Sequence, residues 1–541
     1  MSFLAILLAT FLHEDITCIS VGLLIREGRV DRLAGVLACF TGIFIGDLGL
    51  WLIGRLFGRR LLRMRWIAAR LHAERMEQLA TWFNRRGWQL VVAARFVPGT
   101  RFPVFLAAGI LGRSAWQFAL IAMLAATVWT PMLVLGSAWL GKPVVESLRG
   151  WLGSTWLAIA LAVLLIMIAL YVVERMATPI GRAQLIATVS RLWRWEFWPQ
   201  WLFYIPVVPW IAWLVLRHRS LMAPTAANPA IPHSGIVGES KFDILSRLPS
   251  EWIVPTALIP AGRAADDGSG DVSAERVALL RRLMVERGWT YPLILKPDAG
   301  ERGAGVRLVR DDAAAAAYLQ RFAVPIVAQV YHPGPFEAGV FYVRLPSEPR
   351  GRIFSITDKA PPVLTGDGQH TVEQLIWRHP RFRMQADVFL DRFADQADRV
   401  LDRGEELRLA VAGNHCQGTL FRDGGHLLTP ALEAAIDGIA RHFDGFFFGR
   451  FDLRYADVAA LRAGRDFRIV ELNGALSEST NIYDPARSLL WAYGTLFRQW
   501  WWLYEIGAAN AARGARVSSW GELRRDMRRY YQQQQVAPNS D

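Results

Sequence analysis

Long apolar segments that occur only in the first 216 residues constrain the fold of this 541-residue chain most. Residues 33–54, 115–140 and 153–173 are long and predominantly apolar. A helix needs about 20 such residues to cross the hydrocarbon core of a bilayer. The rest of the chain has the mixed pattern of a globular α/β protein. We therefore expect an α-helical polytopic membrane domain followed by an α/β domain.

Two other apolar segments are interrupted by charges and helix-breaking residues. Residues 1–25 contain Glu14 and Asp15, and residues 88–112 contain Arg95, Arg101 and two prolines. Such residues are tolerated at membrane depth only where they face protein or a water-filled cavity. The two segments therefore predict paired re-entrant hairpins that build a polar site inside the membrane.

The charges of this half suit a phosphate-bearing ligand. Arg95 and Arg101 can bind phosphate bidentately and stay charged when desolvated. Glu14 and Asp47 can neutralise them or exchange a proton. A purely structural set of ion pairs, or side chains reaching the interface, is the alternative.

The net charge of +13 does not by itself indicate a protein that binds nucleic acid. Arginines cluster beside the apolar segments, as in positions 55–70, which is typical of anchors that face anionic lipid. No nucleic-acid motif accompanies the charge, so we expect no nucleic-acid partner. The three cysteines form no metal-binding or disulfide pattern.

The first 145 residues resemble the DedA (VTT-type) family of membrane proteins. The resemblance rests on Gly46-Asp47, on the run from Trp51 to Gly58, and on Arg95-Phe-Val-Pro-Gly-Thr-Arg101 with the following small residues to Gly109. Gly136 and Gly141 also fit. The family implies two facing re-entrant loops and movement of phospholipid or polyprenyl phosphate between leaflets. Carried over, Glu14, Asp47, Arg95 and Arg101 are the transport residues.

Lysine is rare in this chain, and its positions are informative. Only four of the 61 basic side chains are lysines, so a retained lysine suggests a need for a compact ammonium. Lys296 ends an expected strand before a loop with Gly300, Gly303 and Gly305, and another strand follows. Backbone N–H groups of such a loop can close over phosphate, although a plain hairpin is the alternative.

A second cluster predicts a metal site. Alternation places Asp452 on one strand, and Glu471 and Asn473 on one face of the next. Paired in a hairpin, these side chains form an all-oxygen cluster suited to Mg²⁺ that bridges phosphates. A solvated strand face is the alternative.

Residues 238–484 resemble the ATP-grasp superfamily, in particular members like D-alanine–D-alanine ligase and cyanophycin synthetase. The resemblance implies ATP and Mg²⁺ as cofactors, phosphate contacts from Lys241, Lys296 and Lys359, and Mg²⁺ ligands at Asp452, Glu471 and Asn473. It also implies an adenine-binding hinge at Gln329 and Tyr331, ribose contacts from Glu337 and a catalytic Arg450. Many members have glutamate where this chain has Gln329.

The expected organisation has four parts: a membrane domain at 1–145, membrane or interfacial helices and a linker at 146–221, the ATP-grasp domain at 222–485, and an aromatic helix with a tail at 486–541. Whether 199–216 spans the membrane is left open, as is a homo-oligomer. The aromatic run after residue 489 suggests docking onto membrane, with core packing as the alternative.

The fusion predicts a multi-pass protein of the bacterial inner membrane that moves a phosphate-bearing lipid. Its ATP-grasp domain would face the cytoplasm and join a carboxylate to an amine or thiol on a lipid-linked or envelope substrate, through an acyl phosphate. Its partners would be membrane lipid and small carboxylate and amine substrates. Two alternatives remain: a lipid transporter with an ATP-binding regulatory domain, and a ligase anchored by a membrane domain that moves nothing.

Overall fold

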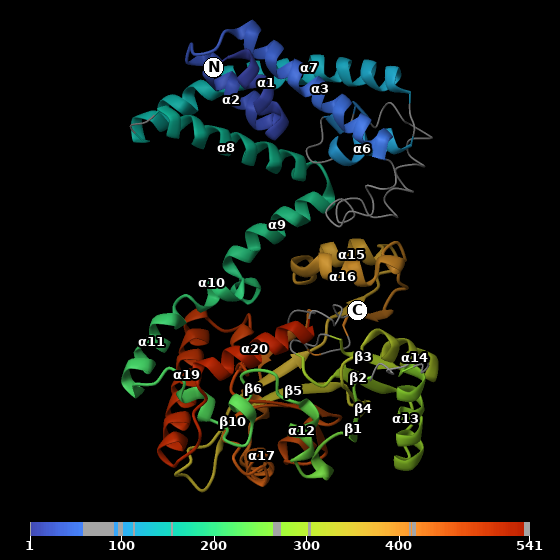
Figure 1. Cartoon of the computed structure of the whole chain (residues 1–541), viewed down its shortest axis with the longest axis vertical. Coiled ribbons are helices and arrows are strands. Elements are labelled where there is room, and N and C mark those ends of the chain that lie inside the picture. The colour runs from blue at the N-terminus through green and yellow to red at the C-terminus, as the bar shows by residue number, and fades with distance from the viewer. Residues whose placement is uncertain are drawn as a thin grey trace. The chain divides into compact units, whose positions relative to one another are not determined.

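The computed structural model describes residues 2–57, 91–92, 94–95, 101–111, 114–152, 155–262, 272–300, 305–410, 413 and 418–534. It divides into two compact units, Met1–Leu185 and Ile186–Asp541, which are described separately below. Figure 1 shows the first unit as helices alone and the second as helices around β-sheets. Helix α9 (Pro179–Trp193) contains the boundary between them.

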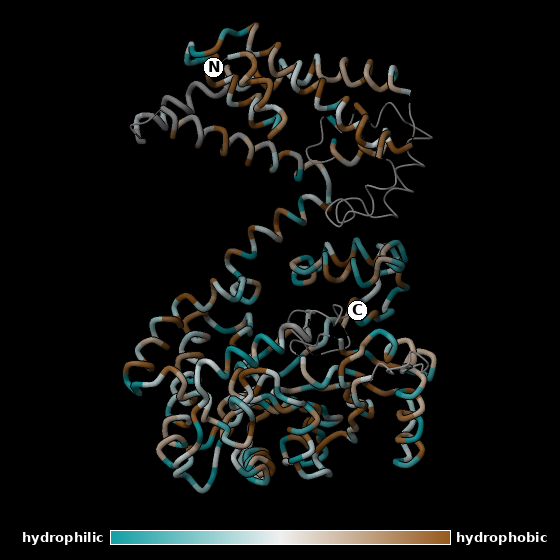
Figure 2. The backbone as a smooth tube through the Cα atoms, in the orientation of Figure 1, coloured by the Kyte–Doolittle hydropathy of each residue, from teal (hydrophilic) through white to brown (hydrophobic). Residues whose placement is uncertain are grey.

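The first unit consists of helices whose sequences are mostly apolar, as Figure 2 shows. They are α1 (Phe3–Leu12), α2 (Glu14–Arg26), α3 (Arg32–Phe57), α6 (Arg101–Ile110), α7 (Ala115–Leu152) and α8 (Thr155–Met176). Within the described residues, Arg32–Phe57 and Ala115–Trp139 are long and apolar enough to cross a membrane. The segments expected at 33–54, 115–140 and 153–173 thus correspond to α3, α7 and α8.

The interrupted segment 1–25 forms two helices instead of one. His13 has extended backbone angles between α1 and α2, and its ring nitrogen Nδ1 accepts a hydrogen bond from the Ile16 backbone N–H. The break therefore places Glu14 in the first turn of α2. Most of 88–100 lies outside the described residues, so the two re-entrant hairpins stay a prediction.

Close packing of α3 against α6 depends on two glycines of the family motif. A Cβ atom at Gly54 would lie 2.3 Å from the Leu106 carbonyl oxygen, and one at Gly109 would lie 2.1 Å from the Trp51 carbonyl oxygen. Small residues let helix backbones approach in this way inside membranes. The contact holds the C-terminal half of α6 alongside α3.

The smaller sheet of the second unit supports the glycine-rich loop. Its strands are β1 (Thr256–Ile259), β2 (Leu293–Pro297), β3 (Arg307–Val309) and β4 (Ile326–Val330), in the order β1-β4-β2-β3. All of its pairings are antiparallel. Helices α13 (Val272–Arg287) and α14 (Asp312–Arg321) share its apolar core. The two predicted strands around Lys296 are confirmed by β2 and β3, whereas residues 301–304 of the loop between them lie outside the described residues.

The larger sheet holds the predicted metal ligands. Its strands are β5 (Phe336–Val343), β6 (Arg352–Ala360), β9 (Leu420–Asp423), β10 (Phe448–Tyr455) and β11 (Phe467–Asn473), in the order β11-β10-β5-β6-β9. Helix α17 (Pro430–His442) packs into its core. The predicted hairpin is confirmed, because β10 and β11 pair antiparallel with Asp452 opposite Glu471.

The aromatic helices of the second unit pack on one another. Helices α10 (Gln200–Tyr204) and α11 (Val207–His218) lie against α19 (Leu489–Ala512), which also contacts the larger sheet. Trp210 donates its indole N–H to the Phe497 carbonyl oxygen at 2.9 Å, and the two rings lie 5.4 Å apart. With 12 residues, α11 is too short to span a bilayer by itself.

The aromatic run of α19 therefore contributes to core packing, which was the alternative to membrane docking. Leu503 and Tyr504 are buried, and the three tryptophans before them are partly buried against α11 and the larger sheet. Helix α20 (Trp520–Gln534) follows and packs Leu523 and Tyr530 against Val237.

Candidate functional site

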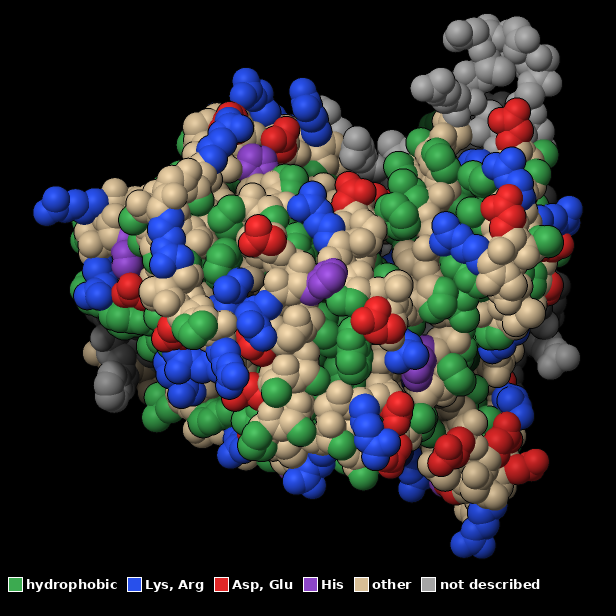
Figure 3. Space-filling view, turned by 90° about the horizontal axis from the view of Figure 1, so that it is seen from below, with side chains coloured by type: hydrophobic (Ala, Val, Ile, Leu, Met, Phe, Trp, Pro, Cys, Tyr) green, Lys and Arg blue, Asp and Glu red, His purple; other side chains and the backbone are tan. Residues whose placement is uncertain are grey.

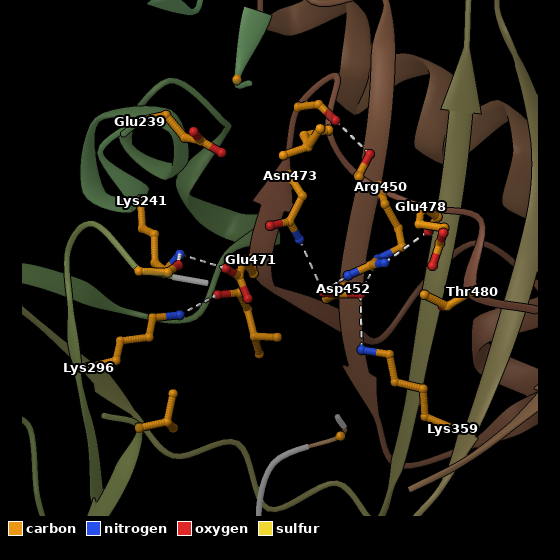
Figure 4. A pocket seen from close by; sticks show the side chains of 18 of the residues that line it. Glu239, Lys241, Lys296, Lys359, Arg450, Asp452, Glu471, Asn473, Glu478 and Thr480 are labelled. Carbon is orange, nitrogen blue, oxygen red and sulfur yellow. Dashed lines mark hydrogen bonds and ion pairs between the residues drawn. The ribbon is translucent and has the colours of Figure 1, made fainter. Parts of the chain in front are cut away.

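A cavity of about 640 Å³ lies between the four-stranded and the five-stranded sheet of the second unit, the smaller and the larger sheet described above. Strands β2 and β4 of the smaller sheet and β5, β6, β10 and β11 of the larger one line it. It brings together nearly all of the site residues predicted for this half: Lys241, Lys296, Gly300, Gln329, Tyr331, Glu337, Lys359, Arg450, Asp452, Glu471 and Asn473. Figure 4 shows the charged members pointing toward one another from both sheets.

Lys241 enters the cavity from the first turn of α12 (Lys241–Ser246), which Ser240 caps. Its Nζ atom lies 3.0 Å from a Glu471 carboxylate oxygen and donates to the Gly300 carbonyl oxygen at 2.5 Å. Burial alone would lower the pKa of this lysine, but Glu471 raises it above the usual value. Lys241 therefore stays protonated at neutral pH.

Asp298 fixes this segment, although no sequence motif pointed to it. It follows β2, accepts a hydrogen bond from the Lys241 backbone N–H through its carbonyl, and accepts another from the Phe242 N–H through its carboxylate. The two lysine-bearing segments, α12 and β2, are thus tied together through backbone groups.

Lys296 and Gln329 share one acceptor. Both donate to the Val470 carbonyl oxygen, at 3.1 Å from Lys296 Nζ and 3.2 Å from Gln329 Nε2. Burial lowers the pKa of Lys296 to about 8, against the opposing attraction of Glu471. The Lys296 ammonium therefore loses its proton at mildly alkaline pH. Among the described residues, no carboxylate lies as close to Lys296 as Glu471 lies to Lys241.

Asp452 is the most heavily paired carboxylate of the cavity. Arg450 donates to both of its oxygens, at 3.0 and 3.2 Å, and Lys359 donates to it at 3.0 Å. Burial opposes ionisation, but Arg450 and then Lys359 hold the Asp452 pKa at about 2. The Asn473 amide donates to the same carboxylate at 3.2 Å.

The Asp452, Glu471 and Asn473 side chains fit a magnesium ion by chemistry and placement. They offer two carboxylates and one amide oxygen from paired strands, and the Glu471 pKa is also lowered, by Lys241 and Lys296 against the effect of burial. Among the described residues, no group of three His, Cys, Asp or Glu side chains is arranged for a metal. The Asn473 side-chain oxygen would be a third protein ligand beside the two carboxylates.

The remaining predicted residues line the cavity less centrally or not at all. Glu337 lies beside Lys359 in the β5–β6 ladder and accepts its hydrogen bond at 2.7 Å. Gly305 has a positive φ of 71° and contacts Pro297, but it does not line the cavity. Gly303 lies outside the described residues.

Glu478 also lines the cavity, and the sequence analysis did not identify it as a site residue. Glu478 accepts hydrogen bonds from the hydroxyls of Tyr204 and Tyr483, the latter at 2.7 Å, and Arg450 donates to its carbonyl oxygen at 2.9 Å. Tyr204 belongs to α10, in the segment 199–216 whose relation to the membrane the sequence left open. No local pattern could connect it to a residue 274 positions later.

The four predicted transport residues form one closed cluster in the first unit. Arg95 pairs with Asp47 and, at 3.5 Å, with Glu14, while Arg101 pairs with Glu14 and, at 2.7 Å, with Asp47. The Arg95 and Asp47 side chains are almost fully buried. The cluster thus contains two arginines and two carboxylates, so their charges sum to zero. Its members come from α2, α3, α6 and the segment before α6.

Solved structures that resemble this chain include a synthetase and a ligase. A bifunctional glutathione synthetase from Pasteurella multocida is 14% identical, with 48% of this chain and 35% of that chain covered at a TM-score of 0.27. The D-Ala:D-Ser ligase VanG from Enterococcus faecalis is 12% identical, with 47% and 57% covered at a TM-score of 0.26. Both scores lie below 0.5, so the assignment of the second unit rests on its own residues.

The N-terminal part of the chain matches membrane proteins. An uncharacterized membrane protein of Haemophilus influenzae is 30% identical over 124 residues, which is 22% of this chain and 58% of that protein's length. Undecaprenyl phosphate transporter A of Bacillus subtilis is 26% identical over 179 residues, which is 32% of this chain and 87% of that protein. Residues 12–138 match the family model of the VTT domain. The predicted resemblance is thereby confirmed: the N-terminal part of this chain is a VTT (DedA) domain.

Proposed function

We propose that this protein joins a membrane domain that moves a phosphate-bearing lipid between leaflets to a cytoplasmic ATP-grasp ligase. The observation that carries the ligase half is the convergence of Lys241, Lys296, Lys359 and Arg450 with an oxygen cluster on one cavity. Four cations suit the phosphates of a nucleotide, and the oxygen cluster suits the magnesium that accompanies them. ATP and Mg²⁺ in the cytoplasm set the proposed orientation.

The ion pairs of the cavity suggest how the nucleotide is held. Lys241 and Lys359 each pair with a carboxylate that is a proposed magnesium ligand. Phosphate oxygens can replace these carboxylates as partners of the lysines, and the carboxylates then turn to the metal. Magnesium would supply a positive charge that bridges and neutralises the phosphates.

The proposed reaction has two steps. An oxygen of a substrate carboxylate attacks the γ-phosphorus of ATP, so that an acyl phosphate forms and ADP leaves. An amine nitrogen then attacks the acyl carbon, phosphate leaves, and the amine loses a proton. Arg450, between Asp452 and the Glu478 carbonyl, is placed to stabilise charge on the transferred phosphoryl group. The substrate is proposed to be lipid-linked or part of the cell envelope.

The lipid-moving half rests on the VTT domain and the arginine cluster. Undecaprenyl phosphate transporter A, one matched relative, is named for a phosphate-bearing polyprenyl lipid. Arg95 and Arg101 can each exchange a carboxylate partner for a phosphate, because guanidinium binds both bidentately. Glu14 and Asp47 would then be released and could accept protons.

The ligase proposal is tested with the full-length protein in lipid nanodiscs. ATP binding and ADP release are measured against Mg²⁺ concentration, with a pool of carboxylates and amines present. Glu471→Gln keeps the side-chain shape but removes a charge from the oxygen cluster, so it should raise the Mg²⁺ concentration needed and lower turnover. The exposed Asp444→Asn serves as control. A wild-type protein that binds no ATP in the presence of Mg²⁺ would contradict the proposal.

A further inference from the structure

Helices α10 and α11 present an apolar face to the outside of the second unit. Trp201, Ile205, Val208 and Leu216 are 70%, 54%, 59% and 76% exposed, and Trp213 is also exposed. In α11 these positions recur at helical spacing, so they share one side of the helix. We call these five residues the α10–α11 face. Figure 2 shows the hydrophobic colour along α11.

The opposite side of α10 and α11 packs against the rest of the second unit. Phe203, Val207 and Leu214 are buried against α19, and Trp213 lies 6.0 Å from the Trp501 ring at one edge of the face. The α10–α11 face therefore cannot turn inward without breaking that packing. A soluble protein seldom leaves a contiguous apolar surface of this kind without a partner.

Charge around the face points to an anionic partner. Residues 197–238 contain no aspartate or glutamate, whereas Arg217 and Arg219 follow Leu216 at the end of α11. Glu505 of the neighbouring helix α19 lies 3.1 Å from Arg217. On the face of the molecule that Figure 3 shows, acidic and basic side chains are interspersed among apolar ones. Tryptophans together with arginines at the edge of an apolar helix are typical of the interface between lipid headgroups and acyl chains.

The chain connects this face directly to a domain that lies in a bilayer. The second unit begins within α9, which follows α8, and the VTT domain precedes both helices. The headgroup region of a membrane that holds the VTT domain is thus available to α10 and α11. We propose that the α10–α11 face lies in the interface of a bilayer that contains anionic phospholipid, with Arg217 and Arg219 among the headgroups.

This docking has a consequence for the cavity. Phe203 and Tyr204 of α10 line the cavity from the inner side of the helix whose outer side carries Trp201 and Ile205. One cavity wall is therefore a helix that rests on lipid. If the proposed ligase function holds, an amphiphilic substrate can keep its chain in the bilayer while its polar end enters the cavity.

Depth-dependent fluorescence quenching tests the docking in the full-length protein. Ile205→Cys is labelled with NBD in a Cys416→Ser background and reconstituted in nanodiscs of phosphatidylcholine and phosphatidylglycerol. Cys18 and Cys39 are buried, and the signal of the background protein is subtracted. Doxyl groups near the headgroups are expected to quench the label at position 205. Val285→Cys on α13 is the matched control, since Val285 is also apolar and 83% exposed, and it should not be quenched.

The outcomes separate lipid from other occupants. Equal quenching at 205 and 285 would overturn the proposal, and so would a blue-shifted but unquenched label at 205, which would mean that protein covers the face. Val208→Cys provides a second position on the same face. Adding Arg219→Glu to Ile205→Cys should lower the quenching, and unchanged quenching would refute the role of charge. None of these readouts depends on ATP or on ligation, so a failed ligase proposal leaves this test intact.

Discussion

Asp452 lies directly opposite Glu471 in the β10–β11 ladder, and each of these neighbouring carboxylates is paired with a different lysine. The Lys359 pair joins β6 to β10 within the larger sheet, whereas the Lys241 pair joins α12 to β11. Two like charges so close are tolerated only because cations surround them. The same arrangement suits an exchange of these lysines from carboxylate to phosphate.

Lys296 should make nucleotide binding depend on pH. Its pKa is about 8, and only the protonated form attracts phosphate. ATP affinity should therefore fall as pH rises above about 8, and binding at pH 8.5 should take up a proton. Calorimetry in two buffers with different ionisation enthalpies measures that proton. Lys296→Ala should lose the uptake and bind ATP roughly ten- to a hundredfold more weakly; uptake that persists in this variant would assign the proton to another group.

Arg450→Ala distinguishes a ligase from a nucleotide sensor. In a ligase, its contact strengthens as charge develops, so turnover should fall about a hundredfold or more while ATP affinity changes little. Arg454→Ala is the comparison, because Arg454 is on the same strand and lines the same cavity but contacts the Tyr331 ring. It should raise KM for ATP more than it lowers kcat. An Arg450→Ala protein with normal turnover would favour the regulatory alternative.

Two variants distinguish the contribution of the arginine cluster to stability from its contribution to lipid transport. Asp47→Asn leaves Arg95 buried without its closest carboxylate, which should destabilise the protein by about 3–5 kcal/mol. The double variant Asp47→Asn/Arg95→Gln restores zero net charge and should recover part of that loss in thermal unfolding. Both proteins should fail to move lipid in reconstituted vesicles. Normal transport by the double variant would reduce the cluster to a structural role.

Gly109 should be sensitive to the smallest substitution. The Cβ of Gly109→Ala would meet the Trp51 carbonyl oxygen and force α6 from α3, at a cost of about 1–3 kcal/mol or more. Arg101 and Asp47 would separate as a result. Gly136→Ala is the matched control, because no atom lies within 4 Å of its added Cβ and alanine favours a helix by up to about 1 kcal/mol. Thermal unfolding in detergent compares the two; equal midpoints would contradict the packing argument.

The sequence alone determined features that depend on local periodicity or on rare residues. Alternation placed Asp452, Glu471 and Asn473 on paired strands, and the scarcity of lysine selected Lys241, Lys296 and Lys359. Charges inside apolar segments likewise selected the four residues that form the arginine cluster. In each case the physical reason is local, because a strand fixes which side chains share a face and a buried charge needs a partner.

Only the tertiary structure decided features that join distant segments. An apolar aromatic helix has the same sequence pattern whether lipid or protein covers it, so residues 199–216 could not be assigned until α19 was seen to cover one side of them. The hydrogen bond from Tyr204 to Glu478 likewise joins segments that are far apart in the sequence. Gln329 donates to the Val470 carbonyl oxygen, a backbone atom that no motif encodes. Side-chain pattern specifies which face is apolar, but the partner of that face depends on how the whole chain folds.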